Sequence, residues 1–263
     1  MTSPWLLLGS GWIALCLFMT VVWLVSRVIH NAGIVDVAWA LGFTLAAALY
    51  IYLGHPSNIR QGLMLMMNTI WSLRLAWHLA LRFKKWYPEE DPRYTALRAQ
   101  MGDSAEVKML MVFLWQASIL ALMTAPLAVA VADRRSDLDV WQYAGMAMWL
   151  VALCGESLAD YQLSLFTAQP LNKGRTCQIG LWRYSRHPNY FFEWLGSLAF
   201  FIYASDSPYG IWTVICPAVL LHLLINVSGV KPAEAHSLQS RSDYADYKRR
   251  TSTFVPWFRK DLS

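Results

Sequence analysis

The sequence predicts an all-α protein that crosses a membrane about seven times. Of its 263 residues, 56% are hydrophobic and only 15% are charged, whereas a soluble domain usually carries about 25% charged residues. Trp, Tyr and Phe make up 14% of the chain, and such side chains gather at membrane interfaces. We therefore expect a single integral membrane domain over residues 1–263, in contact with membrane lipids and not with nucleic acid.

Seven apolar runs approach the roughly 20 residues that a helix needs to span a bilayer. The first run is too long for the core of a typical signal peptide, and no Lys or Arg precedes it. Each of the seven is expected to form one spanning helix. In chain order the runs are 5–26, 33–53, 61–82, 109–131, 140–163, 189–205 and 210–228.

Two polar segments between and after these runs are expected at the membrane surface. The loop 82–107 carries charges of both signs and is expected to form a solvated helix that could cover a cofactor. Residues 238–250 are expected to form a second surface helix. Its cations Lys248, Arg249 and Arg250 would attract anionic lipid or face a nucleotide phosphate.

The distribution of Lys and Arg predicts the orientation of the chain. The loops after the first, third and fifth runs and the tail after the seventh carry 18 of these residues, and the opposite side carries 3. Cytoplasmic loops hold the excess of positive charge. We therefore expect the C-terminus in the cytoplasm, the N-terminus outside, and the protein in a bacterial inner membrane.

Several ionisable side chains lie inside the apolar runs, where a charge costs roughly 2.5–3.5 kcal/mol on insertion scales. With the expected orientation, all of them fall in the cytoplasmic half of the bundle, and together they predict a polar cavity open to the cytoplasm. Interhelical ion pairs or side chains that reach to the interface are the alternative. The residues are Asp36, Arg74, His78, Glu156, Asp160 and Glu193.

The densest motif in the chain is residues 180–194. Pro188 suits the first position of a helix, and Arg183, Arg186 and His187 precede it, so the unpaired N–H groups of that helix and these side chains predict an anion site. Tyr190 could stack on a ligand, and Glu193 could accept hydrogen bonds from it. A belt of interfacial Arg, Tyr and Trp anchors is the alternative interpretation.

The string GLWRYSRHPNYFFE, Gly180 to Glu193, resembles the signature of bacterial membrane proteins related to the C-terminal domain of steroid 5-alpha-reductases. The segments 160–162 (DYQ), 172–175 (NKGR), 35–39 (VDVAW), 90–94 (EDPRY) and 251–256 (TSTFVP) fit the same family. The resemblance covers most of residues 30–258.

This resemblance implies a seven-span enzyme that reduces an activated carbon–carbon double bond with NADPH. The cofactor would enter from the cytoplasm and a lipid-like enone from the membrane, with residues 1–107 on the substrate side and 108–263 binding the cofactor. Asn189, Glu193 and Asp160 match cofactor-binding positions, and His236 and Tyr247 fall near the C-terminal cofactor cover. Arg183, Arg186, His187 and Tyr190 are the candidates from the motif itself.

The chain departs from the eukaryotic steroid reductases in its N-terminal half, where those enzymes hold the steroid ketone with a Gln-Glu pair and a Tyr. No such pair occurs in the second run, and Trp71 stands where the Tyr is expected. Asp36 is the candidate acid, which an apolar pocket would keep protonated, and Tyr94 is the candidate phenol. Tyr50, Tyr52 and Tyr87 remain open as donors.

Two other functions fit parts of the sequence. Membrane methyltransferases that use S-adenosylmethionine also carry Arg-His-Pro-x-Tyr, as in residues 186–190, but their later pair of Glu residues is reduced here to Glu234. A transporter or lipid-binding protein would also explain charges within the membrane. No metal site is expected. The substrate and the oligomeric state stay open.

Overall fold

A computed structural model describes residues 2–260, and this part of the chain is helical apart from connecting segments and an isolated bridge between Ser185 and Ser252. It divides into two compact units. The N-terminal unit comprises Met1–Asp139 and Ala204–Thr213, and the C-terminal unit comprises Val140–Tyr203 and Val214–Ser263. The sequence placed its functional division after residue 107; the structural division falls after Asp139, because α5 and α6 pack on α1, α2 and α3.

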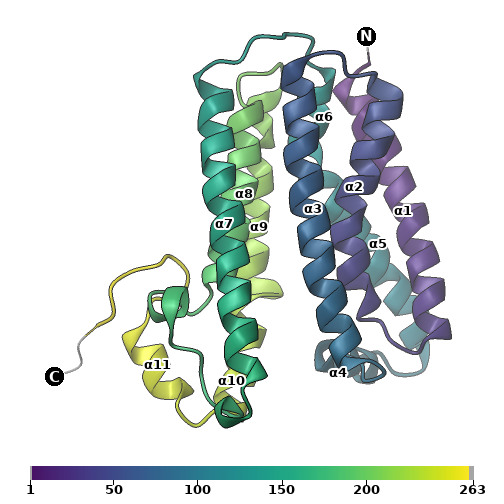
Figure 1. The fold of residues 1–263 in the computed structure, drawn as a ribbon. Helices are drawn as coiled ribbons and strands as arrows, with labels where there is room; N and C mark the ends of the chain where they lie inside the picture. Colours follow the sequence, from purple (N-terminus) through teal and green to yellow (C-terminus); the bar gives the residue numbers. More distant parts are fainter. Residues whose placement is uncertain (1, 261–263) are drawn as a thin grey trace. The chain divides into compact units, whose positions relative to one another are not determined.

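The N-terminal unit is a bundle of long helices (Figure 1). Its helices approach closely where glycine lies opposite a large side chain. A Cβ on Gly42 would come within 2.3 Å of the Leu120 side chain, and one on Gly11 within 2.5 Å of Tyr50 Oη. The elements are α1 (Pro4–Val28), α2 (Ile34–Gly54), α3 (Ile59–Trp86), α4 (Pro92–Met101), a 3-10 turn (Gly102–Ser104), α5 (Ala105–Met123) and α6 (Ala125–Ala132).

The predicted single span 109–131 is divided into α5 and α6 at Thr124. Pro126 has no N–H to donate to the preceding turn, so the regular helix stops there. Thr124 Oγ1 donates to the carbonyl of Ala121 and lies 2.9 Å from Tyr50 Oη. The hydroxyl groups thus satisfy polar atoms at the break.

A buried ion-pair cluster holds the loops at one end of the N-terminal unit. Arg60 is almost fully buried and pairs with Asp206 and, at 3.6 Å, with Asp133. Gln61 donates to the carbonyls of Val131 and Asp133 at 2.6 and 2.8 Å. The segment Ala204–Thr213 therefore belongs to this unit through Asp206.

The C-terminal unit is organised around α7 and α8. A Cβ on Gly145 would meet the backbone of Tyr203, and one on Gly155 the ring of Phe192, so the two helices touch along their length. Its elements are α7 (Val140–Ala168), 3-10 turns at Pro170–Asn172 and Gly180–Arg183, α8 (Pro188–Ala204), α9 (Ile215–His222), a π-helical turn (Leu223–Val227), α10 (Val230–Ser240) and α11 (Tyr244–Arg250). A 3-10 turn at Gly210–Val214 precedes α9.

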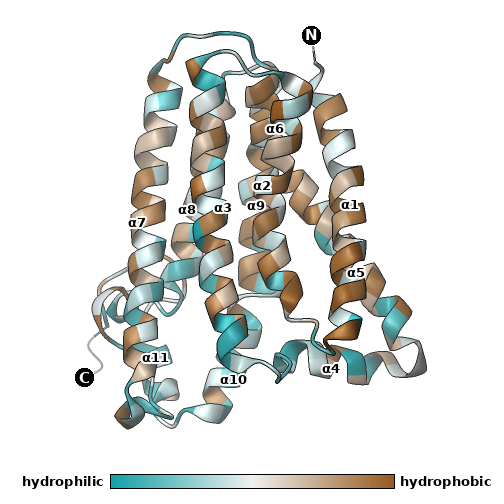
Figure 2. Ribbon diagram, turned by 45° about the vertical axis from the view of Figure 1, so that its right-hand side comes forward, coloured by the Kyte–Doolittle hydropathy of each residue, from teal (hydrophilic) through white to brown (hydrophobic). Residues whose placement is uncertain are grey.

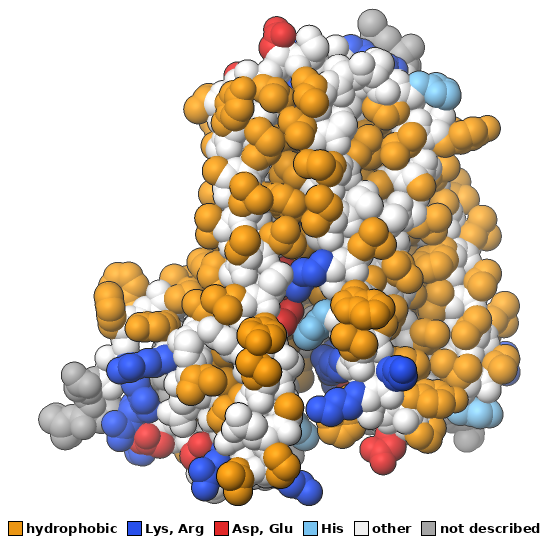
Figure 3. Space-filling view, in the orientation of Figure 1, with side chains coloured by type: hydrophobic (Ala, Val, Ile, Leu, Met, Phe, Trp, Pro, Cys, Tyr) orange, Lys and Arg blue, Asp and Glu red, His pale blue; other side chains and the backbone are white. Residues whose placement is uncertain are grey.

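The seven apolar runs are largely helical, but 109–131 is divided and 210–228 combines α9 with a 3-10 and a π-helical turn. Four helices among residues 2–260 are long and apolar enough to cross a membrane. They are Pro4–Val28, Ile34–Gly54, Ala105–Met123 and the composite Gly210–Ser240. Figure 2 colours α1 hydrophobic along most of its length and α4 largely hydrophilic, and hydrophobic side chains predominate on the face drawn in Figure 3. These helices are those of an integral membrane protein.

The two polar segments have more structure than predicted. The loop 82–107 contains α4 and a 3-10 turn, after the last residues of α3. The predicted single helix 238–250 is wrong: α10 ends at Ser240 and α11 begins at Tyr244. The Asp243 carboxylate between them accepts from the Thr176 N–H and hydroxyl at 3.1 and 2.6 Å, which fixes the turn.

Candidate functional site

The N-terminal unit brings together the two predicted catalytic residues. Asp36 lies in the first turn of α2 and Tyr94 in the first turn of α4, and Tyr94 Oη donates to Asp36 Oδ1 at 2.7 Å. Arg93 Nη2 donates to the other oxygen of Asp36 at 2.8 Å. Asp36 thus accepts from a phenol and a guanidinium at once.

The environment of this pair decides which group holds the proton. The Tyr94 side chain is 8% exposed, and burial together with the Asp36 carboxylate raises the pKa of the phenol well above its ordinary value. Asp36 is in an ion pair with Arg93. Tyr94 is the hydrogen-bond donor of the pair and Asp36 the acceptor.

Asp91 holds Arg93 and the start of α4 in place. It is the N-cap of α4, ahead of Pro92, and it accepts from the backbone N–H of Arg93 at 3.0 Å. Its carboxylate also accepts from Arg93 Nε at 2.9 Å and from Arg82 at 3.0 Å. Burial alone would raise the pKa of Asp91, but the hydrogen bonds and charge of Arg93 outweigh it and lower the pKa.

The segment before α4 is fastened to the start of α2. Asn31 Nδ2 donates to the carbonyls of Pro88 and Glu89 at 3.3 and 3.0 Å, and the Ala32 N–H donates to Glu90 Oε1 at 2.7 Å. These bonds fix α4 over the first turn of α2. The position of Tyr94 beside Asp36 follows from them.

In the C-terminal unit, Arg186 binds the chain's own C-terminal segment. Its Nε pairs with Glu234 at 2.7 Å, and its Nη1 donates to the carbonyls of Lys248 and Thr251 at 2.6 and 3.0 Å. Its Nη2 donates to Thr253 Oγ1 at 2.7 Å, and the residue is 8% exposed. Arg186, predicted as a phosphate contact, is thus committed to protein partners in this structure.

His187 and Tyr190 lie at the start of α8, directly after Arg186. Their rings stack with centroids 5.4 Å apart and an interplanar angle of 1°. His187 Nε2 lies 3.6 Å from Glu234 Oε1, and Lys248 Nζ lies 2.7 Å from Glu234 Oε2. Glu234 therefore gathers three nitrogen-bearing side chains at the start of α8.

Asp160 and Asn189, predicted to bind the cofactor together, are in contact. Asn189 Nδ2 lies 3.4 Å from Asp160 Oδ1. Asp160 is buried near the end of α7, and the indole of Trp182 donates to the neighbouring carbonyl of Ala159 at 2.9 Å. Glu193 follows Asn189 by one turn of α8 and is partly buried.

The other predicted residues of this unit differ in exposure. Arg183 and His236 are exposed. Tyr247 is buried, and its hydroxyl donates to the carbonyls of Trp182 and Ser185 at 2.5 and 3.0 Å. Burial raises the pKa of Tyr247. Tyr247 therefore fixes the backbone ahead of α8, whereas Arg183 presents its charge to solvent.

Several side chains of the C-terminal unit are of kinds that bind nucleotides in other proteins. A carboxylate beside an amide suits ribose hydroxyls, an aromatic stack suits a ring, and an exposed guanidinium suits phosphate. These groups are Asp160, Asn189, Tyr190 and Arg183.

Comparison with known proteins assigns the chain to a family. A family model described as "Protein of unknown function (DUF1295)" matches residues 22–251. The chain belongs to this family. An uncharacterized protein of Schizosaccharomyces pombe (strain 972 / ATCC 24843) is similar to this DUF1295 protein, with 24% identity over 263 residues that cover 90% of the chain and 76% of the relative. No solved structure matches.

Sequence reasoning missed two side chains that organise the clusters of this DUF1295 protein. Arg93 joins Asp36 to Asp91, and Glu234 joins Arg186 to Lys248. The Asp91-Pro92 pair is a helix-start signal, and it could have placed Arg93 beside a carboxylate. No local pattern indicates the partner of Glu234, because Arg186 lies 48 residues away.

Proposed function

We propose that this DUF1295 protein reduces a carbon–carbon double bond conjugated to a carbonyl group, in a lipid-like substrate, with NADPH as reductant. The contact between Tyr94 and Asp36 carries this proposal. Reduction of an enone places negative charge on the carbonyl oxygen, and a hydrogen-bond donor aimed at that oxygen stabilises it. Tyr94 would be this catalytic donor, and Asp36 with Arg93 would position it.

Bound NADPH would supply a hydride to the carbon β to the carbonyl. Asp160 and Asn189 would bind the ribose or carboxamide groups, with Glu193 one turn further along α8. Arg183 would meet phosphate, and the ring of Tyr190 would pack on the ligand. Arg186, His187 and Tyr247 would hold the turn before α8 in shape, and His236 would lie at the cofactor cover.

The proposal includes seven membrane spans, with the N-terminus outside and the C-terminus in the cytoplasm of a bacterial inner membrane. The excess of Lys and Arg on one side of the apolar runs supports this orientation. It would give the residues around Arg183 access to cytoplasmic NADPH. The relation to steroid 5-alpha-reductases belongs to the same proposal and rests on the string 180–193.

A cofactor titration is the first test. Purified protein in lipid nanodiscs is titrated with NADPH, and binding is followed by the fluorescence of the nicotinamide. Enones with steroid, terpenoid and fatty-acyl skeletons are then compared by NADPH consumption. We expect saturable binding and turnover with at least one skeleton. Absence of NADPH binding by folded protein would refute the proposal.

The Tyr94→Phe variant tests the assigned donor. Loss of the hydroxyl removes general-acid assistance, so we expect turnover to fall by about 10²–10⁴-fold, with NADPH binding retained. Tyr143→Phe is the matched control, because Tyr143 is exposed on α7 and has no part in the cluster; it should leave turnover unchanged. Unchanged turnover in Tyr94→Phe would remove Tyr94 from the mechanism.

One observation favours the methyltransferase alternative. Arg186 and His187, from Arg-His-Pro-x-Tyr, meet Glu234, the single Glu that remains of the later acidic pair. Titration of NADPH and S-adenosylmethionine against the same preparation separates the two functions. Saturable binding of S-adenosylmethionine alone would replace the reductase proposal.

A further inference from the structure

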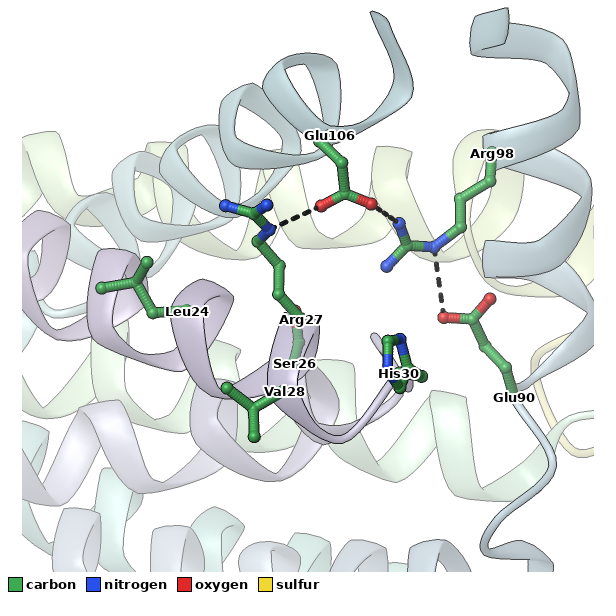
Figure 4. A pocket seen from close by; sticks show the side chains of 8 residues that line it. All are labelled: Leu24, Ser26, Arg27, Val28, His30, Glu90, Arg98 and Glu106. Carbon is green, nitrogen blue, oxygen red and sulfur yellow. Dashed lines mark hydrogen bonds and ion pairs between the residues drawn. The ribbon is translucent and has the colours of Figure 1, made fainter. Parts of the chain in front are cut away.

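A groove in the N-terminal unit lies where α1 ends and α5 begins. It has a volume of about 700 Å³. Figure 4 shows side chains from the end of α1, from the segment before α4, from α4 itself and from the start of α5 around it. Asp36, Arg93 and Tyr94 do not line it, although it shares Glu90 with the segment that positions them. The groove is therefore a separate candidate for a ligand.

Charges of opposite sign alternate along the polar wall of this groove. Arg27 Nε lies 3.2 Å from Glu106 Oε2, and Arg98 Nη1 lies 2.6 Å from Glu106 Oε1. Arg98 Nε lies 3.4 Å from Glu90 Oε1. Two guanidinium groups and two carboxylates give no net charge. Such a wall is complementary to a ligand that carries both signs a few ångströms apart.

The α1 side of the groove also carries exposed apolar side chains. Leu24 and Val28 line it and are 48% and 79% exposed. They lie in the last two turns of α1, and α1 and α5 are both long and apolar enough to cross a membrane. The groove thus lies at the level where acyl chains give way to headgroups, and its ligand must be amphiphilic.

His30 lines the groove in a conformation that disfavours a side chain. Its φ is 52°, in the left-handed region. A residue with a Cβ is strained there, and glycine would avoid the strain. The left-handed residue here ends α1: the Asn31 N–H donates to the carbonyl of Ser26 at 3.0 Å, as in a common helix-terminating turn. The imidazole of His30 projects toward the groove beside Arg98 and Glu90 (Figure 4).

We propose that this groove binds a zwitterionic phospholipid whose headgroup carries a primary ammonium, as in phosphatidylethanolamine. The phosphate would accept from Arg27, Arg98 and His30, and the ammonium would donate to Glu90 and Glu106. One acyl chain would run along Leu24 and Val28. A choline headgroup has no N–H to donate to the carboxylates, and a purely anionic headgroup would leave them opposed by negative charge.

Lipid retention tests the proposal without reference to any activity. Purified full-length protein is exchanged into phosphatidylethanolamine, phosphatidylcholine or phosphatidylglycerol with identical acyl chains, and bound lipid is counted by native mass spectrometry. Loss of one charge-assisted contact corresponds to roughly tenfold in affinity. We expect about tenfold preference for phosphatidylethanolamine, reduced by Arg27→Gln and by Glu106→Gln. Lys231→Gln removes an exposed cation of α10, in the other unit, and should change nothing.

The His30→Gly variant tests whether the His30 side chain takes part in lipid binding. Relief of the left-handed strain should raise the unfolding temperature of delipidated protein, and loss of the imidazole should lower retention of phosphatidylethanolamine. A more stable variant with unchanged retention would overturn the role of His30. Equal retention of the three lipids, or preference for phosphatidylglycerol, would overturn the proposal as a whole.

Discussion

Tyr94 is the residue whose environment most constrains the chemistry of the N-terminal unit. Its hydroxyl is buried against a carboxylate that is already paired with Arg93. Loss of the phenol proton would place a second negative charge beside this carboxylate, so Tyr94 stays a hydrogen-bond donor. A substrate oxygen that becomes negatively charged during reduction could accept that hydrogen bond. The Tyr94 hydroxyl therefore supports the reductase proposal.

The same environment predicts how stability depends on alkaline pH. Burial and the Asp36 carboxylate raise the pKa of Tyr94 in the folded chain, whereas a Tyr in the unfolded chain titrates near 10. The raised pKa contributes stability that is fully present below about pH 10 and is lost as the pH rises toward the folded-state value. Unfolding temperatures of wild type should therefore fall more steeply above pH 10 than those of Tyr94→Phe.

The comparison with Tyr94→Phe isolates this residue, because Tyr244 and Tyr247 also have raised pKa values and contribute to both proteins. At neutral pH the variant should be less stable by about 1.5–3 kcal/mol, the value of a hydrogen bond to a charged group. Chemical unfolding in detergent measures the difference. Identical pH profiles would mean that Tyr94 is not buried against Asp36.

At the scale of elements, the Arg186 cluster fastens α8, α10 and the segment after α11 to one another. Arg186→Gln would remove the ion pair with Glu234 and the bonds to the carbonyls of Lys248 and Thr251. Breaking a buried pair costs about 3–5 kcal/mol. We expect the segment from residue 248 onward to become protease-sensitive, and limited proteolysis would detect it.

Arg249→Gln is the control for this variant. Arg249 pairs with Asp246 on the surface of α11, and exposed pairs contribute little. It should leave both proteolysis and unfolding unchanged. Resistance of the Arg186→Gln protein to protease would contradict the fastening role.

The contact between α7 and α8 depends on small residues. In Gly145→Ala, the new Cβ would lie 2.8–2.9 Å from Tyr203, including its backbone, so the helices must shift at a cost of about 1–3 kcal/mol. In Gly196→Ala, the nearest atom is 3.8 Å away, and the variant should gain about 0.5–1 kcal/mol of helix propensity. Unfolding temperatures of the two variants should move in opposite directions.

The elements differ in how far the sequence could specify them. The seven apolar runs are largely helical because continuous hydrophobicity is a local signal, and Pro188 starts α8 for an equally local reason. The break at Thr124 could be read from Pro126. The turn between α10 and α11 could not, because Asp243 is held by Thr176, 67 residues away.

The candidate site shows the same difference between local and distant signals. The sequence singled out Asp36 with Tyr94 and Asp160 with Asn189, and each pair is in contact. Residue type and the resemblance were enough to choose them. The protein partners of Arg186 come from three later segments. Its role in holding these segments together could therefore be recognised only in the folded structure.

At the scale of the whole molecule, the orientation of the chain is directly measurable. The excess of basic residues predicts an N-terminus outside and a C-terminus in the cytoplasm. A C-terminal green fluorescent protein fusion should fluoresce, and a C-terminal alkaline phosphatase fusion should be inactive, because the phosphatase folds only outside the cytoplasm. The reverse pattern would exclude an odd number of spans with this orientation.

The pairing of Arg60 with Asp206 has a consequence for biosynthesis. The segment Ala204–Thr213 completes a unit whose other residues end at Asp139. Residues 140–203 must therefore be synthesised before the Arg60 guanidinium can pair with Asp206, its second counter-ion. During translation the growing bundle must hold a buried cation against Asp133 with incomplete compensation. In Asp206→Asn this second counter-ion is never supplied, so the buried guanidinium stays incompletely compensated after translation as well.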